Sequence, residues 1–343
     1  MNPKYILTAA IFALALPAMA QQGAPPDPQM KAVLDELAAL GGKPIETLSP
    51  DKARQQPTPA DAVMKLMKKQ DKKGPEPVGE VDDTSIAIGD HKVKVRVYSP
   101  KGKGPFPVIL YIHGGGWVIA DLDTYDATPR ALCNLVNAIV ISTEYRHAPE
   151  HKFPAAHEDV FAVYQAVLKN GWKRNYDSKQ IAIVGESAGG NMAAAVCLMA
   201  KERGVEMPLA QILVYPVADV TDMDTPSYKE NAEAKPLNKP MMEWFGKHTV
   251  ANPEDKKNPY LSPALAGNAL KGLPPATIIN AQIDPLKSDG DKLAKAFTDA
   301  GVKVNHKIYN GVTHEFFGMS AVVDKAKEAQ EFAATDLKAA FGK

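Results

Sequence analysis

The segment around Ser187 constrains the fold more than any other part of the chain. An apolar run at residues 180–184 predicts a strand, residues 185–189 read Gly-Glu-Ser-Ala-Gly, and an Ala- and Met-rich helix is expected at 188–202. A G-x-S-x-G sequence between a strand and a helix is typical of a nucleophile elbow, a sharp turn that holds a serine hydroxyl clear of the sheet. The glycines allow the close backbone approach that such a turn needs. The pattern therefore predicts a serine for acyl transfer.

Strand and helix patterns alternate along the main part of the chain. Apolar strands are expected at residues 107–112, 138–142, 180–184, 211–215, 276–280 and 304–309, and further helices at 128–136, 154–168, 287–300 and 324–341. Strands without a polar face indicate a mostly parallel sheet covered by helices on both sides, which is an α/β fold. Before them, residues 85–97 alternate apolar and charged side chains around Gly89-Asp90, which predicts an antiparallel hairpin.

Two regions lie outside this alternation. Amphipathic helices are expected at residues 30–40 and 61–69, and a long Pro- and Asn-rich insertion at about 217–260 contains a further helix at 239–250. Long insertions in compact domains are usually functional. We therefore predict N-terminal cap helices and a linker at 21–80, followed by the main domain at 81–343. The N-terminal helices and the insertion are expected to form a helical cap over the active site.

The first 20 residues have the pattern of a secretory signal peptide. Lys4 precedes an apolar run at 5–16, and Ala18-Met19-Ala20 is a cleavage signal. About a dozen apolar residues are too few to span a bilayer. We therefore predict export to the periplasm or the medium without a stable membrane anchor. Export permits a disulfide, but Cys133 and Cys197 are expected to be free thiols, because both fall in apolar helices on opposite faces of the sheet.

A serine nucleophile needs a histidine as base, and that histidine needs a carboxylate to fix its tautomer. In an open parallel sheet, such partners follow the carboxyl ends of later strands. Asp284 follows the strand at 276–280 and His314 follows the strand at 304–309. The order Ser187, Asp284, His314 is the order expected of an α/β-hydrolase. Asp289 is the alternative acid, and Glu186 is expected to brace the elbow.

A glycine run after the strand at 107–112 supplies the fourth element of the predicted site. His113-Gly114-Gly115-Gly116 is an H-G-G-G sequence, which provides backbone N–H donors for an oxyanion together with the residue after the serine, Ala188. We predict an oxyanion hole of Gly115, Gly116 and Ala188, with Gly114 as a further candidate. His113 is expected to support this loop.

The remaining histidines are assigned no part in the chemistry. His91 and His306 are expected to be structural or solvated, and His248 lies in the insertion; His147, His151 and His157 cluster in the sequence without a recognisable metal-ligand spacing. We therefore predict no metal and no organic cofactor. A formal net charge of zero gives no indication of a nucleic-acid partner, and a homodimer is left open.

From about residue 80 to 335, the chain resembles bacterial esterases of the hormone-sensitive lipase group, within the α/β-hydrolases. The resemblance rests on the motifs HGGGW at 113–117, YRHAPEH at 145–151, FPAA at 153–156, GESAGG at 185–190, LSP at 261–263, GLPP at 272–275, DPL at 284–286 and HEFF at 314–317. It implies Ser187 as nucleophile, Asp284 as acid and His314 as base, with a two-part cap. Glu315 departs from the pattern, since glycine is common there, as do Lys287 and Ser288, where Arg-Asp is more usual.

Taken together, these features predict a serine carboxylesterase. The resemblance implies that it hydrolyses small-molecule esters of short to medium acyl chains, and the triad implies an acyl-enzyme intermediate. A deacetylase or amidase using the same triad is one alternative. The other is a catalytically inactive ligand-binding protein on the same fold, although such proteins usually lose an element of the site and none is lost here.

Overall fold

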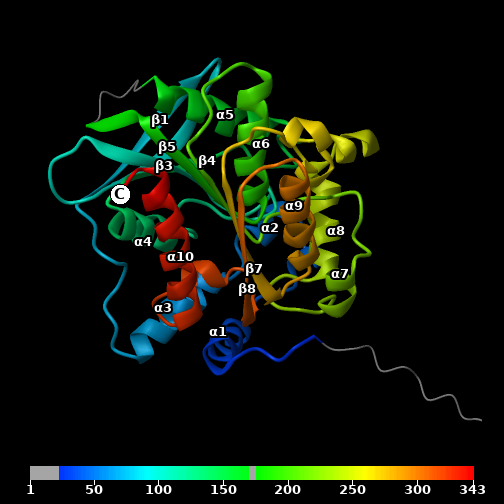
Figure 1. Ribbon diagram of the computed structural model, residues 1–343. Helices are drawn as coiled ribbons and strands as arrows, with labels where there is room; N and C mark the ends of the chain where they lie inside the picture. The colour runs from blue at the N-terminus through cyan, green and yellow to red at the C-terminus, as the bar shows by residue number, and fades with distance from the viewer. Residues whose placement is uncertain (1–22, 170–174) are drawn as a thin grey trace, which may run out of the picture.

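The computed structural model describes residues 23–169 and 175–343, and the expected signal peptide at 1–20 lies outside them. One eight-stranded sheet forms its centre, in the order β1-β2-β4-β3-β5-β6-β7-β8 (Figure 1). The strands are β1 (Glu80–Ile88), β2 (His91–Ser99), β3 (Phe106–Ile112), β4 (Ile139–Glu144), β5 (Tyr176–Glu186), β6 (Gln211–Val214), β7 (Ala276–Ile283) and β8 (Val304–Thr313).

The predicted hairpin is an antiparallel pair at one edge of this sheet. β1 pairs with β2 over its whole length, from Glu80 opposite Ser99 to Ile88 opposite His91, and β2 pairs antiparallel with β4. All pairings from β4 across to β8 are parallel. The α/β-hydrolase sheet expected from the sequence is therefore confirmed, with several strands longer than predicted.

Helices cover both faces of the sheet. α5 (Ala155–Leu168), α6 (Ala188–Glu202) and α9 (Lys287–Asp299) contribute to one apolar core, and α4 (Ala127–Val136) and α10 (Asp324–Ala340) contribute to the other. Figure 1 shows α6 and α9 on one side of the sheet, with α4 and α10 on the opposite side. The central strand β3 contributes to both cores because its successive side chains point to opposite faces of the sheet. Val108, Leu110 and Ile112 lie in one core, and Ile109 and Tyr111 lie in the other.

The two cysteines are free and buried, as predicted. Cys133 on α4 lies in one core and Cys197 on α6 lies in the other, so the sheet separates them. Burial raises the pKa of the Cys133 thiol to about 12. Both residues therefore act as small apolar core side chains.

The N-terminal helices are α1 (Pro28–Ala39), α2 (Pro50–Ala53) and α3 (Pro59–Lys69), with the short 3₁₀ turn η1 (Ile45–Thr47) between α1 and α2. The segment between β6 and β7 runs from residue 215 to 275, longer than the predicted insertion. It contains α7 (Pro226–Glu230), α8 (Lys239–Thr249) and the 3₁₀ turns η2 (Pro253–Lys257), η3 (Pro263–Leu265) and η4 (Gly267–Leu270).

These two regions meet each other. The indole Nε1 of Trp244 on α8 donates to the carbonyl oxygen of Leu48 (3.1 Å), next to η1. Directly after α2, Arg54 donates to the carbonyl oxygens of Val118 (2.8 Å) and Ala148 (2.9 Å) in the main domain. Thr249, at the end of α8, donates to the carbonyl oxygen of Gly116 (3.3 Å). Both regions therefore contact the neighbourhood of the glycine loop.

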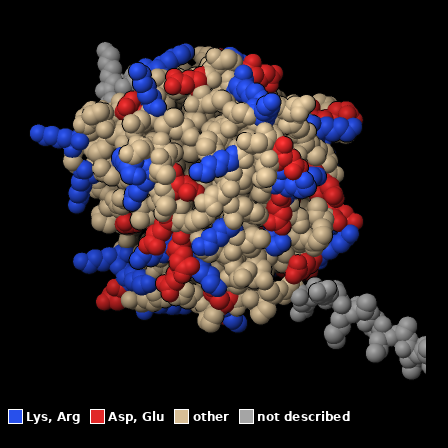
Figure 2. All heavy atoms as spheres, viewed as in Figure 1, with Lys and Arg blue, Asp and Glu red and all other residues tan. Residues whose placement is uncertain are grey.

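The charged residues are spread over the visible surface. Figure 2 shows basic and acidic side chains interspersed on one face, without a large area of one sign. No helix in the described part of the chain is long and apolar enough to cross a membrane.

Candidate active site

Ser187 lies in a strained turn between β5 and α6. Its backbone has φ 57° and ψ −119°, a conformation that costs on the order of 1–3 kcal/mol for a residue with a side chain. The turn is tight enough that a Cβ on Gly185 would lie 2.1 Å from the carbonyl oxygen of Gly189. The backbone N–H of Ser187 donates to the carbonyl oxygen of Val214 on β6 (2.9 Å), which ties the turn to the neighbouring strand.

The structure brings the three residues of the predicted triad together. His314 Nε2 lies 2.9 Å from Ser187 Oγ, and His314 Nδ1 lies 2.6 Å from Asp284 Oδ2. Asp284 follows β7 directly and His314 follows β8 directly. All three side chains are at least 95% buried, with 5% of Ser187 exposed. The geometry places one imidazole between a hydroxyl and a carboxylate, which is the arrangement of a nucleophile, a base and an orienting acid.

The charge of Asp284 acts on this imidazole. Burial opposes the protonated form, but the Coulombic attraction and hydrogen bond of Asp284 outweigh it and raise the pKa of His314. A base whose pKa is raised accepts the serine proton more readily. Because Asp284 is hydrogen-bonded to Nδ1, the proton resides on that nitrogen and Nε2 is free to receive one from Ser187.

The glycine loop lies against Ser187 in a conformation that glycine favours. Gly115 has φ 95° and Gly116 has φ 57°. A Cβ on Gly114 would lie 3.1 Å from Ser187 Cβ, and one on Gly116 would lie 2.3 Å from the ring of Phe245. Larger residues at these positions therefore require the loop or its neighbours to move.

The N–H groups of this loop point to no protein acceptor. Over residues 23–169 and 175–343, the N–H groups of Gly115 and Gly116 donate no hydrogen bond, and Ala188 is the first residue of α6, where a helical N–H has no intrahelical acceptor. The carbonyl of Gly114 instead faces inward and accepts from Tyr145 Oη (2.8 Å). His113 stacks on the Tyr145 ring, with centroids 4.4 Å apart, and its Nδ1 lies 2.9 Å from the same carbonyl oxygen. Both side chains thus fix the loop.

Two carboxyl groups flank the triad, that of Glu186 buried and that of Glu315 partly buried. Glu186, before the nucleophile, accepts hydrogen bonds from the hydroxyls of Tyr111 and Tyr215. Glu315, after the base, accepts from Tyr125 Oη (2.6 Å), and its Oε1 lies 3.9 Å from His314 Nε2. Burial, as the main cause, and repulsion from Glu315, as the second, raise the pKa of Glu186 to about 7. Burial also raises the pKa of Glu315.

The roles of these tyrosines are not apparent from the sequence. Tyr111 lies on β3, Tyr215 directly follows β6, and Tyr125 lies in the loop before α4. No spacing in the sequence marks them, because their hydroxyls reach the carboxylates only through the packing of the folded chain. Glu315, in contrast, is marked in the sequence, because it stands where glycine is common in the family. Its φ of 70° is a value that favours glycine.

The competing residues are engaged elsewhere. Asp289, the alternative acid, accepts the backbone N–H groups of Ala218 (2.9 Å) and Asp219 (3.0 Å). Burial raises the pKa of Asp289 to about 7. His91 Nε2 lies 2.8 Å from Asp159 Oδ1, and His157 Nε2 lies 3.0 Å from Asn191 Oδ1. These contacts are structural.

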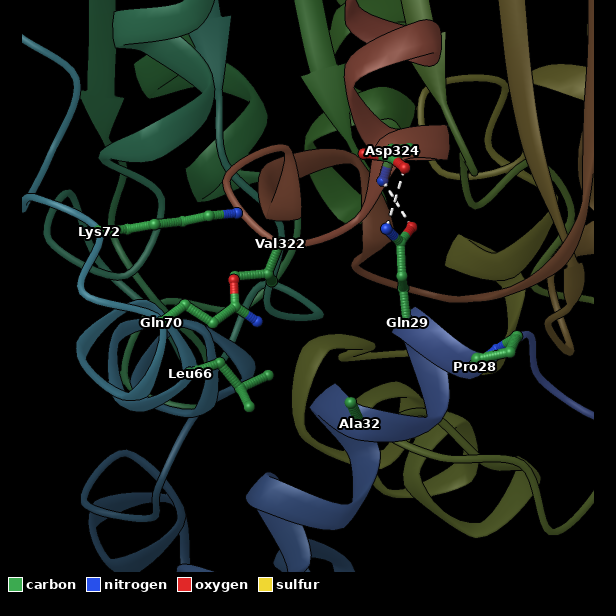
Figure 3. A pocket seen from close by; sticks show the side chains of 8 residues that line it. All are labelled: Pro28, Gln29, Ala32, Leu66, Gln70, Lys72, Val322 and Asp324. Atoms are coloured by element: carbon green, nitrogen blue, oxygen red, sulfur yellow. Dashed lines mark hydrogen bonds between the residues drawn. The ribbon is translucent and has the colours of Figure 1, made fainter.

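A cavity of about 620 Å³ reaches the two carboxyl groups beside the triad, although no triad residue lines it. Glu186 and Glu315 line it, with side chains from α3 and α4 that include Met64, Met67 and Leu135. Its wall is therefore mostly apolar, with carboxyl groups on the side nearest the triad. A smaller cleft of about 260 Å³ lies between α1, α3 and the start of α10, and no triad residue lines it (Figure 3). Gln29 closes one side of that cleft by two 2.9 Å hydrogen bonds to Asp324.

Fold and site agree with the comparisons to known proteins, and the chain belongs to the α/β-hydrolase family. The family model described as "alpha/beta hydrolase fold" matches residues 109–318. The carboxylic ester hydrolase LipN of Mycobacterium tuberculosis is 36% identical over 72% of this chain and 66% of its own length. The ethyl acetate hydrolase of Pseudomonas putida is 31% identical over 88% of this chain and 95% of its own. The crystal structure of an esterase from Pyrobaculum calidifontis superposes with a TM-score of 0.84, at 34% identity over 92% of this chain and 99% of that one.

Gly116→Ala tests the glycine loop. The added Cβ meets the ring of Phe245, so the loop has to shift and the N–H groups lose their alignment. We expect kcat for a p-nitrophenyl ester to fall roughly 10²-fold, with a smaller change in KM, as measured by steady-state kinetics.

Gly89→Ala is the matched control for this variant. Gly89 has the same φ of 57° but an added Cβ there meets nothing within 4 Å, so backbone strain is introduced without a clash. Its kcat should equal that of the unaltered protein. Equal activity of the two variants would show that the loop tolerates a side chain at Gly116.

Glu315→Gln tests the carboxyl group beside the base. Removing a negative charge near His314 Nε2 makes its protonated form less favourable and lowers its pKa. We therefore expect the acid limb of the pH dependence of kcat/KM to move to lower pH, by on the order of half a unit. The exposed Glu331→Gln on α10 is the control and should leave the limb in place. A shift to higher pH for Glu315→Gln would contradict the assigned direction.

Proposed function

We propose that this protein is a serine carboxylesterase. The observation that carries the proposal is the position of His314, with Nε2 at 2.9 Å from Ser187 Oγ and Nδ1 at 2.6 Å from Asp284 Oδ2. The curated relatives, including a carboxylic ester hydrolase and an ethyl acetate hydrolase, support the same class of reaction.

In the proposed reaction, Ser187 Oγ attacks the ester carbonyl while its proton moves to His314 Nε2. Asp284 holds the imidazole and stabilises its positive charge. The N–H groups of Gly115, Gly116 and Ala188 receive the oxyanion. The alcohol then leaves with the proton from His314, and a water molecule activated by the same imidazole hydrolyses the acyl-enzyme.

The proposed substrates are small esters of short to medium acyl chains. A mostly apolar cavity of about 620 Å³ beside the triad suits an apolar group of this size. The relative named ethyl acetate hydrolase makes acetate esters the first choice for a substrate series.

We also propose that the N-terminal helices at 21–80 and the insertion at about 217–260 act as a two-part cap. The contact of Trp244 with Leu48 joins the two parts, and Phe245 and Thr249 of α8 lie against Gly116 of the glycine loop. In this proposal, α8 closes one side of the entrance and sets which substrates reach Ser187.

Ser187→Ala tests the nucleophile. Loss of the attacking oxygen should lower kcat on p-nitrophenyl acetate by on the order of 10⁴ or more, and should abolish labelling by a fluorophosphonate probe. Ser142→Ala is the matched control, because Ser142 is also buried and its hydroxyl has no hydrogen-bond partner among the described residues. It should be labelled and active. Full activity of Ser187→Ala, or no labelling of the unaltered folded protein, would favour an inactive binding protein.

Export is proposed from the N-terminal sequence alone. Expressed with residues 1–20 in a Gram-negative host, the protein should be recovered outside the cytoplasm with Gln21 as its first residue, as determined by N-terminal sequencing. Ala20→Leu should block cleavage, because small residues are required at the cleavage site. Recovery of a chain that begins at Met1 and stays in the cytoplasm would refute the proposal.

A further inference from the structure

Outside the triad, two imidazoles and one carboxylate converge beside the glycine loop. His113 follows β3 and Glu144 ends β4, and these neighbouring parallel strands pair Ile112 with Thr143. His113 and Glu144 are the next residues along each strand, so the register sets them side by side at the same edge of the sheet. The chain then turns and returns His147 to them. One ligand atom from each of the three residues lies within 4.8 Å of the others.

One ring nitrogen of each imidazole has no hydrogen-bond partner among the described residues. His113 is fully buried, and its Nδ1 lies 2.9 Å from the carbonyl oxygen of Gly114, which places the proton on Nδ1 and leaves Nε2 with a free lone pair. Within the part of the chain that the structure describes, neither His113 Nε2 nor His147 Nε2 has a hydrogen-bond partner. Buried polar atoms without partners are uncommon and often mark a site for a bound ion or water.

The carboxylate is held with one oxygen available. Glu144 accepts the backbone N–H of Leu122 through Oε2 (2.9 Å), and its Oε1 lies 4.0 Å from His147 Nε2, too far for a hydrogen bond. A side chain anchored through one oxygen, with the other oxygen near the Nε2 of His147, is preorganised for a cation.

The surrounding charges are compatible with a divalent ion. Arg54 is the cation that acts on His147, but its guanidinium is paired with Glu150 at 2.7 Å. Asp121 contributes a further negative charge that acts on both His113 and His147. Lys94 and Asp123 act on Glu144 with opposite signs, so the charges around the cluster sum to a negative value.

We propose that His113, Glu144 and His147 form a binding site for a divalent metal ion of the zinc class. Two imidazoles and one carboxylate are a donor set that zinc accepts, whereas calcium and magnesium prefer oxygen ligands alone. Tetrahedral zinc needs donors roughly 3.3 Å apart, so these side chains have to move together by up to about 1.5 Å. The fourth position remains for water. Because Gly114 follows His113, the ion would immobilise the start of the glycine loop.

Zinc binding to the full chain tests this proposal. Untagged protein treated with a chelator and dialysed should bind about one Zn²⁺ per chain in isothermal titration calorimetry, and its Tm should rise with zinc concentration. Co²⁺ should give the visible absorption of a tetrahedral site. His147→Leu, which removes one ligand, should weaken zinc binding at least 10-fold and remove the Co²⁺ absorption.

His151→Leu is the matched control, because this exposed histidine lies four residues away and outside the cluster. It should bind zinc like the unaltered chain. Circular dichroism and the metal-free Tm of each variant establish that it is folded, and Glu144→Gln provides a second ligand variant that keeps the acceptor for Leu122. Absence of zinc binding by the unaltered chain, or equal binding by folded His147→Leu and Glu144→Gln, would overturn the proposal.

Discussion

The site depends on the parallel register of the strands from β4 to β8. His113 follows β3, Ser187 follows β5, Asp284 follows β7 and His314 follows β8, so each of these residues stands directly after the end of a strand. Because parallel strands end at the same edge, residues separated by more than a hundred positions meet within hydrogen-bond distance. The hydrogen bonds of the triad stabilise an arrangement that the sheet already imposes.

Burial is the second constraint, and it acts differently on each titratable group. Asp284 outweighs the cost of burying a charged His314, which makes the imidazole an effective base. The carboxyl group of Glu186 is instead held by two tyrosine hydroxyls, and burial raises its pKa. Such neutral donors stabilise a buried carboxyl group without placing a competing positive charge beside the nucleophile.

Much of this architecture could be predicted from the sequence, because continuous apolar strands, a serine between two glycines and a glycine run each have a local signature. The ends of the strands were harder to predict: β8 continues to Thr313, whereas the apolar pattern ends at Tyr309. The hydrogen bonds of Tyr111, Tyr125 and Tyr215 could not be predicted, since they depend on which face each side chain takes, and a shift of one residue in register reverses that face.

The convergence of His113, Glu144 and His147 has the same origin. In the sequence, His147 stands near His151 and His157, and the spacing of these three residues matches no metal-ligand pattern. In the fold, its nearest donors come from two strand ends, one of them 34 positions earlier than His147 in the numbering. Ligand spacing in a sequence reveals sites built on one helix or loop, whereas a parallel sheet assembles donors across strands. The same edge that orders the triad therefore also creates a cluster that no linear motif describes.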